Sequence, residues 1–390
     1  MFDFKLPAPE PDASDSSNGI LIQDTLRQVE AWLRSHPTLL SLYANLPALE
    51  LALAAHLKNQ DTELFALVRD AIQRLNQYLE PSQLPLEGLA GLILLNLRAD
   101  QRARAAEFQP AAQRLLAEGL ARFDSQLEYL RASTLDDSQV FHVEGNAKLG
   151  EAFYFAWRVL DDQALRPPAG DVLGQVSTRF DPSFRLYRDE LPPTNDDETR
   201  RLGIIAAAIQ LFLTASETTG RATYIIRACF LADSLVRKED MAAASWLDHA
   251  ALARALTRLE QFTSKPEYRR AAHDILTAIR EFNSPQGIDA ALYALAVQEW
   301  EQFPLHIVII GKAEGDENAN AMWRAALDEY ASTRAIERLD PTRHATRIHT
   351  LGYAVAQDSA LAYVCIGPVC LPPVRSVQDL QRAVERARTV

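Results

Sequence analysis

The stretch Thr219-Gly220-Arg221-Ala222-Thr223-Tyr224 separates two long segments whose apolar residues recur at helical spacing. In the second segment, Ala228, Leu231 and Leu235 fall on one face of a helix. The arrangement returns 44 residues later, where Thr263-Ser264-Lys265-Pro266-Glu267-Tyr268 precedes a face made of Ala272, Ile275 and Ile279. A turn and an apolar face repeated at such an interval are typical of stacked helical hairpins.

Two earlier segments resemble this hairpin. Asn59-Gln60-Asp61-Thr62-Glu63-Leu64 precedes Val68, Ala71 and Leu75, and a fourth face consists of Leu165, Ala169, Val172 and Val176. The helical period continues almost without interruption from residue 20 to residue 302 and predicts about twelve helices. We expect them at residues 20–35, 39–58, 61–79, 86–97, 109–131, 145–160, 168–178, 199–219, 221–237, 245–263, 266–283 and 288–302.

Short connectors such as Ser35-His36-Pro37 make consecutive helices antiparallel. Paired helices over residues 20–302 predict a mainly α protein with a closed α/α toroid, and an open solenoid is the alternative. Residues 1–19 are acidic and contain three prolines, so we expect a flexible, disordered leader there.

The pattern changes at residue 303. Leu305-His306-Ile307-Val308-Ile309-Ile310 is a continuous apolar and β-branched run, which predicts a buried strand. We expect a helix at 317–330, strands at 333–339 and 360–365, and a last helix at 377–388. Strands that alternate with helices predict a small, largely parallel sheet, so residues 303–390 form a separate α/β module.

Composition excludes several classes of partner. The chain of 390 residues has a formal net charge of −12 and a pI near 5.2. It lacks the Lys and Arg clusters that bind nucleic acid or anionic membranes, so we expect neither partner. Its longest apolar stretches, 88–97 and 202–215, are shorter than the ~20 residues that span a bilayer. Three cysteines form no disulfide framework, so we expect a cytoplasmic protein with no cofactor and no metal.

The ending resembles a known family. Ala362-Tyr363-Val364-Cys365-Ile366-Gly367-Pro368-Val369-Cys370-Leu371-Pro372-Pro373-Val374 is similar to the C-terminus of the thioredoxin-domain proteins of the YyaL and spermatogenesis-associated type. The strand at 307–311 and the turn at 219–224 resemble that family too, so the similarity covers about residues 145–390. It implies a toroid of the six-hairpin glycosidase and sugar-epimerase type followed by a small α/β tail. The chain has no Cys-x-x-Cys motif and its N-terminal part is helical in pattern, so we expect the family's thioredoxin domain to be missing.

In a toroid, the loops before the inner helices meet at one mouth of the ring, where ligands bind. We expect the helices that begin near 145, 199, 245 and 288 to be inner ones, because they are the more apolar and Ala-rich partner of each pair. Their leading loops are Phe141-His142-Val143-Glu144, Asn195-Asp196-Asp197-Glu198, Trp246-Leu247-Asp248-His249 and Gln286-Gly287-Ile288-Asp289.

These loops carry the groups that a sugar site uses. Two carboxylates can act as acid and base across a glycosidic bond, and an aromatic face stacks on a pyranose. The candidate catalytic residues are Glu144, Asp248 and His249, and the candidate ligand-binding residues are His142, Asp197 and Trp246. The alternative is structural: the aspartates would cap their helices, and the histidines would be ordinary surface or core residues.

The loop at residues 179–190 is the longest charged and aromatic insertion between hairpins. One hypothesis places it over the mouth, with Tyr187 or Arg188 against a ligand. The other makes it a structural loop that covers the ends of helices.

The cysteines offer little chemistry by pattern alone. Cys365 and Cys370 lack the second pair of ligands that a zinc site needs, so a redox pair and two structural thiols remain as alternatives. Cys229 falls on the apolar face of a predicted helix and is expected in the core.

Three functional classes remain. The first prediction is a helical module without catalysis that binds a protein partner or a ligand, because no sharp catalytic motif is present. The alternatives are a carbohydrate-active enzyme, either a hydrolase or an epimerase, and a binder of a sugar or other small metabolite without turnover.

Overall fold

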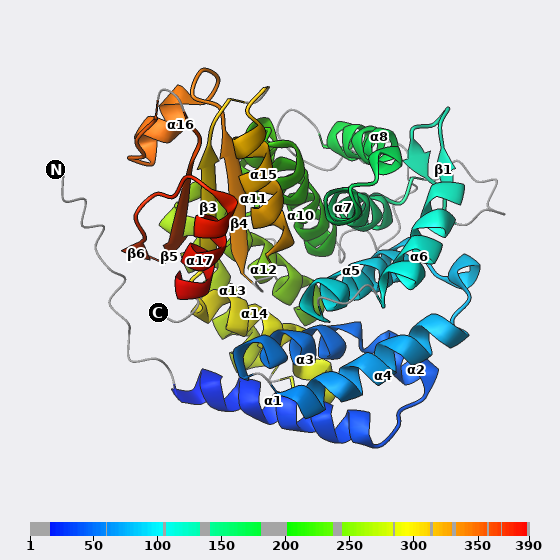
Figure 1. The fold of residues 1–390 in the computed structure, drawn as a ribbon. Coiled ribbons are helices and arrows are strands. Elements are labelled where there is room, and N and C mark those ends of the chain that lie inside the picture. Colours follow the sequence, from blue (N-terminus) through cyan, green and yellow to red (C-terminus); the bar gives the residue numbers. More distant parts are fainter. Residues whose placement is uncertain are drawn as a thin grey trace. The chain divides into compact units, whose positions relative to one another are not determined.

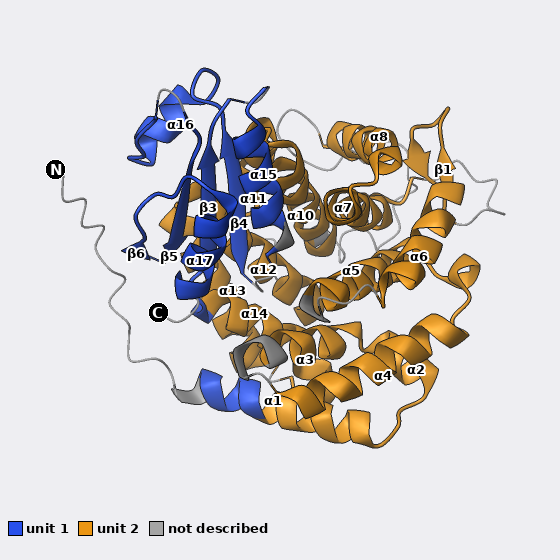
Figure 2. Cartoon of the chain, in the orientation of Figure 1, with its two compact units in different colours: residues 1–23, 301–390 blue, residues 24–300 orange. Residues whose placement is uncertain are grey.

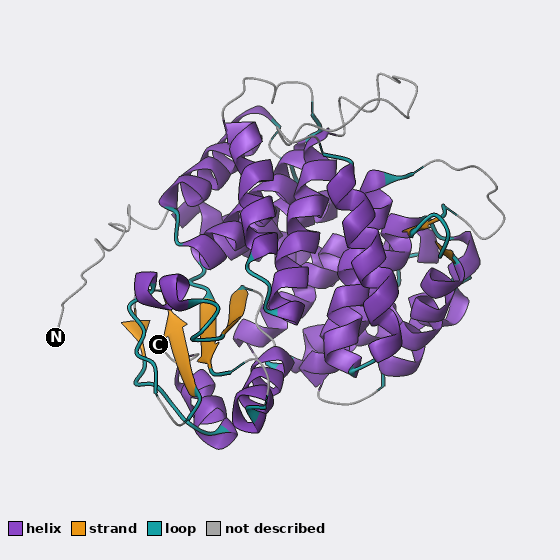
Figure 3. Cartoon of the chain, turned by 90° about the horizontal axis from the view of Figure 1, so that it is seen from above, coloured by secondary structure: helices purple, strands orange, loops and turns teal. Residues whose placement is uncertain are grey.

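The computed structural model describes residues 16–59, 61–103, 107–132, 141–180, 201–236, 244–283, 285–312, 315–329, 333–356, 359–367 and 369–387. The chain divides into two compact units: the first unit in the order of the chain is residues 24–300 (orange, unit 2 in the key of Figure 2), and the second is residues 301–390 with 1–23 (blue, unit 1 in that key). In the described residues, the first unit is built from helices and one small hairpin, and the second contains a four-stranded sheet (Figures 1 and 3).

Six helices in the described part of the first unit form an inner layer. They are α3 (Leu46–Asn59), α5 (Leu86–Ala103), α7 (Val143–Leu160), α10 (Arg201–Thr219), α12 (Trp246–Thr263) and α14 (Ala291–Glu301). From α3 to α12, each helix of this series packs against the next. In α10, residues 202–209 and 211–218 are all buried, so this helix is covered on every side. The helices predicted as inner ones therefore lie inside.

The remaining long helices of this unit, within the described residues, form an outer layer. They are α1 (Ser16–Arg34, of which residues 24–34 belong to this unit), α4 (Thr62–Tyr78), α6 (Gln109–Ala121), α8 (Arg166–Thr178), α11 (Thr223–Val236) and α13 (Pro266–Phe282). The apolar faces predicted from the repeats, in α4, α8, α11 and α13, are all buried, which confirms the hairpin repeat. Inner and outer helices alternate along the chain in antiparallel pairs, so the inner helices run in one direction and begin at one rim.

A buried network of ion pairs crosses the interior of the inner layer. Arg254 of α12 donates to Glu299 of α14 at 2.7 Å and to Glu50 of α3 at 2.8 Å. Arg98 of α5 also donates to Glu50. The bond from Arg254 to Glu50 joins α12 to α3 through residues that are 204 positions apart in the chain.

A second set of ion pairs in this interior joins α7, α10 and α12. Arg258 donates to Glu217 at 3.0 Å and lies 3.6 Å from Glu151, and Arg158 donates to Glu217 at 2.5 Å. The arginines and glutamates named in this network are equal in number, so their buried charges cancel. A buried charge is tolerated when it is paired and hydrogen-bonded in this way.

The helix predicted over residues 109–131 is wrong beyond Ala121. There α6 ends, and β1 (Phe123–Asp124) and β2 (Tyr129–Leu130) form an antiparallel hairpin. Arg122, which is 1% exposed, explains the break. Its guanidinium donates to the Glu118 carboxylate and to the backbone carbonyls of residues 81, 82, 84 and 132. These bonds use all five N–H donors of the guanidinium and fix the chain after α6.

Two other predicted boundaries are corrected. The single helix expected at 39–58 is two helices, α2 (Leu39–Ala44) and α3, because Asn45 leaves the helical conformation with φ −117° and ψ 39°. Pro47 then lies in the first turn of α3, where its missing N–H costs nothing. Residues 16–19, assigned to the leader by sequence, form the first turn of α1, and residues 1–15 lie outside the described part of the chain.

The sheet of the second unit is mixed. Its strands are β3 (Leu305–Ile310), β4 (Arg334–Leu339), β5 (Leu361–Ile366) and β6 (Val369–Cys370), in the order β4-β3-β5-β6. Only β3 and β4 are parallel, joined through α15 (Glu317–Asp328), whereas β5 and β6 each run antiparallel to their neighbour. The prediction of a largely parallel sheet is therefore wrong.

The two faces of this sheet are covered by residues of the same unit. Ile307 and Ile309 pack with α15 and with α17 (Val377–Ala387) on one face. Val308 and Ile310 pack on the other face with Ile348 of α16 (Ala345–Thr350) and the residues that follow it. Each face thus has a small apolar core.

The cysteines also differ from expectation. Cys365 and Cys370 form a disulfide, so the interpretation as two structural thiols is wrong. Cys229 is half-buried and not part of the fully buried core.

Among the described residues, one helix is apolar and long enough to cross a membrane by composition alone. It is residues Leu202–Thr219 of α10, with a mean hydropathy of 1.4. Inside the protein 89% of this segment is buried, which is also typical of the central helix of a helical layer.

Candidate functional site

The first turns of α7, α10 and α12 bring two carboxylates together. Gly203 lies in the first turn of α10, between the other two helices. A Cβ atom built on Gly203 would lie 2.5 Å from Oδ1 of Asp248 and 3.7 Å from Oε1 of Glu144. The two carboxylate oxygens are therefore within about 6 Å of each other. The structure brings these two candidate catalytic residues close together at one rim.

Glu144 is held in place by a cation. It is 8% exposed and occupies the first turn of α7, and its Oε1 lies 2.6 Å from Nζ of Lys148 one turn later. The ammonium group and the helix N-terminus both place positive charge beside this carboxylate. Glu144 also shares a helix face with Glu151 and Arg158, which are seven and fourteen residues further along and belong to the buried ion-pair network. Glu144 therefore points to the interior side of α7.

Asp248 is fixed by a capping box. Ser245 is the N-cap of α12, and its Oγ accepts a hydrogen bond from the Asp248 N–H at 3.2 Å. The same hydroxyl donates to Oδ2 of Asp248 at 2.8 Å. The expectation that Asp248 is itself the N-cap is therefore wrong, because Ser245 takes that position. With Oδ2 engaged by Ser245, Oδ1 is the oxygen that faces Gly203.

The other predicted residues near these helices lie at the rim. His249 is half-buried, with Nδ1 2.9 Å from the carbonyl oxygen of Ser245, so its ring is engaged by the start of its own helix. Trp246 is the first residue of α12 and is half-buried. His142 is exposed at the N-cap of α7, where its side chain makes no capping bond.

Three predicted ligand-binding residues cannot be placed. Asp197, Tyr187 and Arg188 lie outside the described residues, as does most of the loop at 179–190. Their proposed positions at the mouth stay predictions.

The sequence reasoning missed a third carboxylate at this rim. A Cβ atom on Gly145 would lie 3.2 Å from Oε1 of Glu87, which is in the first turn of α5. Burial raises the pKa of the Tyr43 phenol, and the nearby Glu87 carboxylate raises that pKa further. The position of Glu87 in its helix could have predicted this carboxylate. An acidic residue occupies the first turn of three inner helices, namely Glu87, Glu144 and Asp248. Glu87 was not predicted, because the helices expected to be inner ones were those that begin near 145, 199, 245 and 288.

Metal binding gains no support from the described residues, in which no group of three or more His, Cys, Asp or Glu side chains is arranged to hold an ion. Among the described residues, the charged groups at this rim are its carboxylates and Lys148, beside the helix N-termini.

Comparison with solved structures identifies the fold of the helical unit. The chain is similar to an unsaturated glucuronyl hydrolase specific for heparin, with a TM-score of 0.60 and 12% identity, covering 73% of this chain and 97% of that one. For an α-1,6-mannanase from Salegentibacter sp., the TM-score is 0.58 and the identity 13%, covering 73% and 98%. For a D-mannose isomerase, the TM-score is 0.51 and the identity 13%, covering 66% and 86%.

Inactive variants of the mannanase, each with two aspartates replaced, were solved in complex with α-1,6-mannotriose and α-1,6-mannotetrose. The sequence of the present chain matches no family model and no curated protein. At these identities the likeness establishes the fold alone. The helical unit is an α/α toroid of the six-hairpin glycosidase type, as predicted, and not an open solenoid.

Proposed function

We propose that the rim formed by α7, α10 and α12 is the active site of a carbohydrate-active enzyme. The observation that carries this proposal is the approach of Glu144 and Asp248 to within about 6 Å over the bare backbone of Gly203. Two carboxylates at such a separation are the minimum equipment for acid–base chemistry on a glycosidic bond. The similarity to toroids named as sugar hydrolases and a sugar isomerase supports the same class of substrate.

The surroundings of the two carboxylates suggest different roles. Glu144, whose carboxylate is held by the Lys148 ammonium group at 2.6 Å, is assigned the role of base. Asp248 accepts a hydrogen bond from the Ser245 hydroxyl at 2.8 Å and is assigned the role of acid. In the proposed reaction, Asp248 in its protonated form donates a proton to the leaving oxygen of the sugar. Glu144 takes a proton from the water that attacks the anomeric carbon, so proton loss and gain balance.

A second candidate is a saccharide-binding module without turnover, which corresponds to the last of the three classes predicted from the sequence. The ion pair between Lys148 and Glu144 favours it, because a carboxylate engaged by a cation is a weaker base. Binding alone needs only hydrogen-bonding groups and a complementary surface at the rim.

The test is a saccharide screen that measures binding and turnover separately. Oligomers of α-1,6-mannose, unsaturated uronic acid disaccharides and free mannose are assayed for binding by thermal shift and for products by chromatography. For the enzyme, Asp248→Asn and Glu144→Gln should each lower turnover by ~10²-fold or more and leave binding nearly intact. Asp70→Asn, an exposed carboxylate of α4 with a single distant partner, is the control and should change neither.

The outcomes separate the two candidates. Binding without products in the wild-type protein would support the module and exclude the enzyme. A lack of binding to every saccharide, or binding that survives simultaneous replacement of Glu144 and Asp248 by alanine, would refute both.

A further inference from the structure

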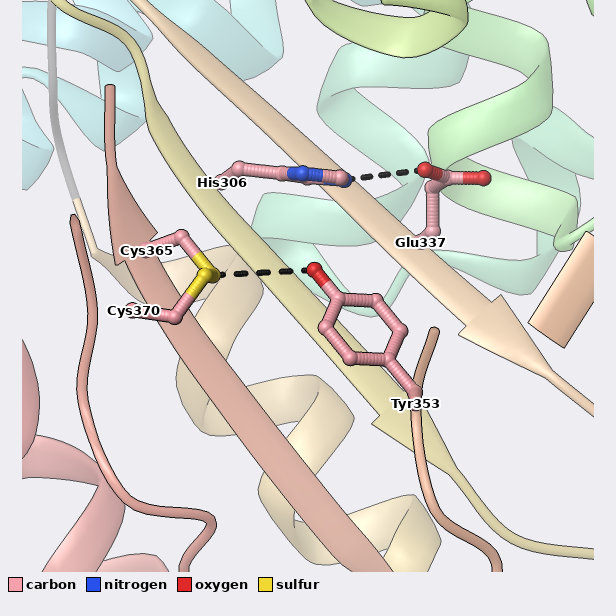
Figure 4. The surroundings of a disulfide bond; sticks show 5 residues. All are labelled: His306, Glu337, Tyr353, Cys365 and Cys370. Atoms are coloured by element: carbon pink, nitrogen blue, oxygen red, sulfur yellow. Dashed lines mark hydrogen bonds and ion pairs between the residues drawn. A yellow bond between two sulfur atoms is a disulfide. The ribbon is translucent and has the colours of Figure 1, made fainter. Parts of the chain in front are cut away.

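The second unit carries a disulfide whose two ends have different surroundings (Figure 4). Cys365 in β5 is 3% exposed, whereas Cys370 in β6 is exposed on the edge strand of the sheet. The two residues are directly opposite in the antiparallel register of these strands. A reagent in solution therefore reaches the sulfur of Cys370 before that of Cys365.

This disulfide is not needed to hold its strands together. Beside it, the N–H of Leu371 donates to the carbonyl of Val364 at 2.9 Å. Ala362 and Val374 exchange two further backbone hydrogen bonds, at 2.8 and 2.9 Å. The cross-link also closes a loop of only a few residues, which restricts the unfolded chain little compared with a long loop. Opening it would leave the β5–β6 pairing intact.

The buried sulfur has a hydrogen-bond partner that suits a leaving thiolate. The hydroxyl of Tyr353 lies 3.6 Å from Sγ of Cys365, and Figure 4 shows this hydroxyl directed at the disulfide. The Tyr353 ring is fixed by stacking on Tyr363, with 4.2 Å between ring centroids. Burial and then the nearby Glu337 carboxylate raise the pKa of Tyr353 to about 12, so its hydroxyl keeps its proton at neutral pH and can donate to sulfur.

A charged cluster lies on the same face of the sheet. His306 of β3 is directly opposite Cys365, and its Nε2 is 2.9 Å from Oε1 of Glu337 (Figure 4). Arg347 donates to the same carboxylate at 2.8 Å. Burial raises the pKa of Glu337, but His306 and Arg347 outweigh it and lower that pKa overall. The His306 imidazole is directed at Glu337 of the neighbouring strand β4, so Tyr353 is the residue that contacts the sulfur of Cys365.

We propose that Cys365–Cys370 is a thiol-exchange site that reacts with a small thiol of the glutathione class. The thiolate of the small molecule attacks Sγ of Cys370 and forms a mixed disulfide. The S–S bond breaks, and its electron pair leaves on Sγ of Cys365, which accepts the Tyr353 hydrogen bond and then a proton from water. A second small thiol attacks the mixed disulfide at the sulfur of the bound small molecule. This attack forms the small-molecule disulfide and releases Cys370 as a thiol. Two small thiols are oxidised to one disulfide, and Cys365–Cys370 is reduced to two thiols.

The experiment uses the full-length protein with Cys229→Ser, so that Cys365 and Cys370 are the only cysteines that can react. The oxidised protein is mixed with reduced glutathione, quenched by alkylation and analysed by mass spectrometry. We expect complete opening of the disulfide in the folded protein, with the transient glutathione adduct on Cys370. In single-cysteine variants, Cys370 in Cys365→Ser should react with oxidised glutathione at least about tenfold faster than Cys365 in Cys370→Ser.

A matched pair of variants tests the role of Tyr353. Tyr353→Phe removes the hydroxyl that contacts sulfur and should slow reduction about fivefold, the effect of losing one hydrogen bond to the leaving group. Tyr363→Phe removes the hydroxyl of the stacked partner, which bonds to the backbone of Ala354 instead, and should leave the rate unchanged. A disulfide that resists glutathione in the folded protein would overturn the proposal. An adduct on Cys365, or equal slowing in both tyrosine variants, would overturn it too.

Discussion

Replacing Glu50 by glutamine tests the ion-pair network at its most connected carboxylate. Burial alone would raise the pKa of Glu50, but the guanidiniums of Arg254 and Arg98 outweigh it and lower the pKa to about 2. The side chain is 21% exposed, so solvent screens this interaction little. Each pKa unit corresponds to about 1.4 kcal/mol, so the shift from 4.5 to about 2 gives Glu50 ~3 kcal/mol of stability at neutral pH.

The direction of the Glu50 pKa shift determines how the free energy of unfolding changes with pH. A depressed carboxylate pKa stabilises the fold above the unfolded value near 4.5, and this stability is lost as pH falls towards 2. We therefore expect Glu50→Gln to lower the free energy of unfolding by ~3 kcal/mol at pH 7. At pH 3 the difference from the wild type should be less than half as large.

Urea unfolding followed by circular dichroism at pH 7, 5, 4 and 3 measures this difference. Asp70→Asn serves as the control and should cost at most ~0.5 kcal/mol at every pH, because its partner Arg74 is 3.9 Å away at the surface. A cost below ~1 kcal/mol at pH 7, or a cost that does not shrink with acid, would refute the electrostatic account of this network.

Other positions give sharp tests. Gly203→Ala places a Cβ atom 2.5 Å from Oδ1 of Asp248, so it should displace that carboxylate and abolish any saccharide turnover. Gly174→Ala in α8 meets no atom within 4 Å and should leave turnover unchanged while raising stability by ~0.5 kcal/mol in urea unfolding. Arg122→Ala should cost ~3 kcal/mol or more, because it leaves Glu118 and four carbonyls without their donor. An equally stable Arg122→Ala protein would show that water replaces the guanidinium there.

The helical ring could be predicted because its information is local. Apolar faces such as Val68, Ala71 and Leu75 are written directly in the residue spacing, and all three are buried. Long-range features were out of reach. The end of α6 depends on Arg122 meeting carbonyls some 40 residues earlier, and a periodic pattern does not record such a contact.

Strand direction is another such feature. The apolar run at 305–310 predicts a buried strand whether its neighbours are parallel or antiparallel to it. The segment between β4 and β5 has the length of a crossover connection, although the two strands that it joins are not parallel neighbours. The antiparallel pairing of β5 with β6 also brings Cys365 opposite Cys370. The spacing of the two cysteines in the sequence did not decide between a disulfide and two free thiols. The resemblance to the YyaL and spermatogenesis-associated family stays a prediction.

Two of the carboxylates at the candidate site could be predicted from the sequence, and the other charged residues could not. Glu144 and Asp248 were found because a loop before an inner helix must open on the rim, and that rule depends only on helix order. Lys148 was missed because its role depends on which face of α7 points inward. Glu87 was missed because the helices of the N-terminal part were not sorted into inner and outer ones.

The bond from Glu50 to Arg254 spans 204 positions of the chain. During synthesis, Glu50 leaves the ribosome long before its main partner exists, and only Arg98 can accompany it in the interval. The early hairpins thus carry an interior carboxylate that gains its second cation only when α12 arrives, and that cation in turn gains Glu299 when α14 arrives. A ribosome-bound chain truncated before α12 should accordingly be sensitive to protease and should engage chaperones, and it should become resistant once residue 299 is outside the exit tunnel.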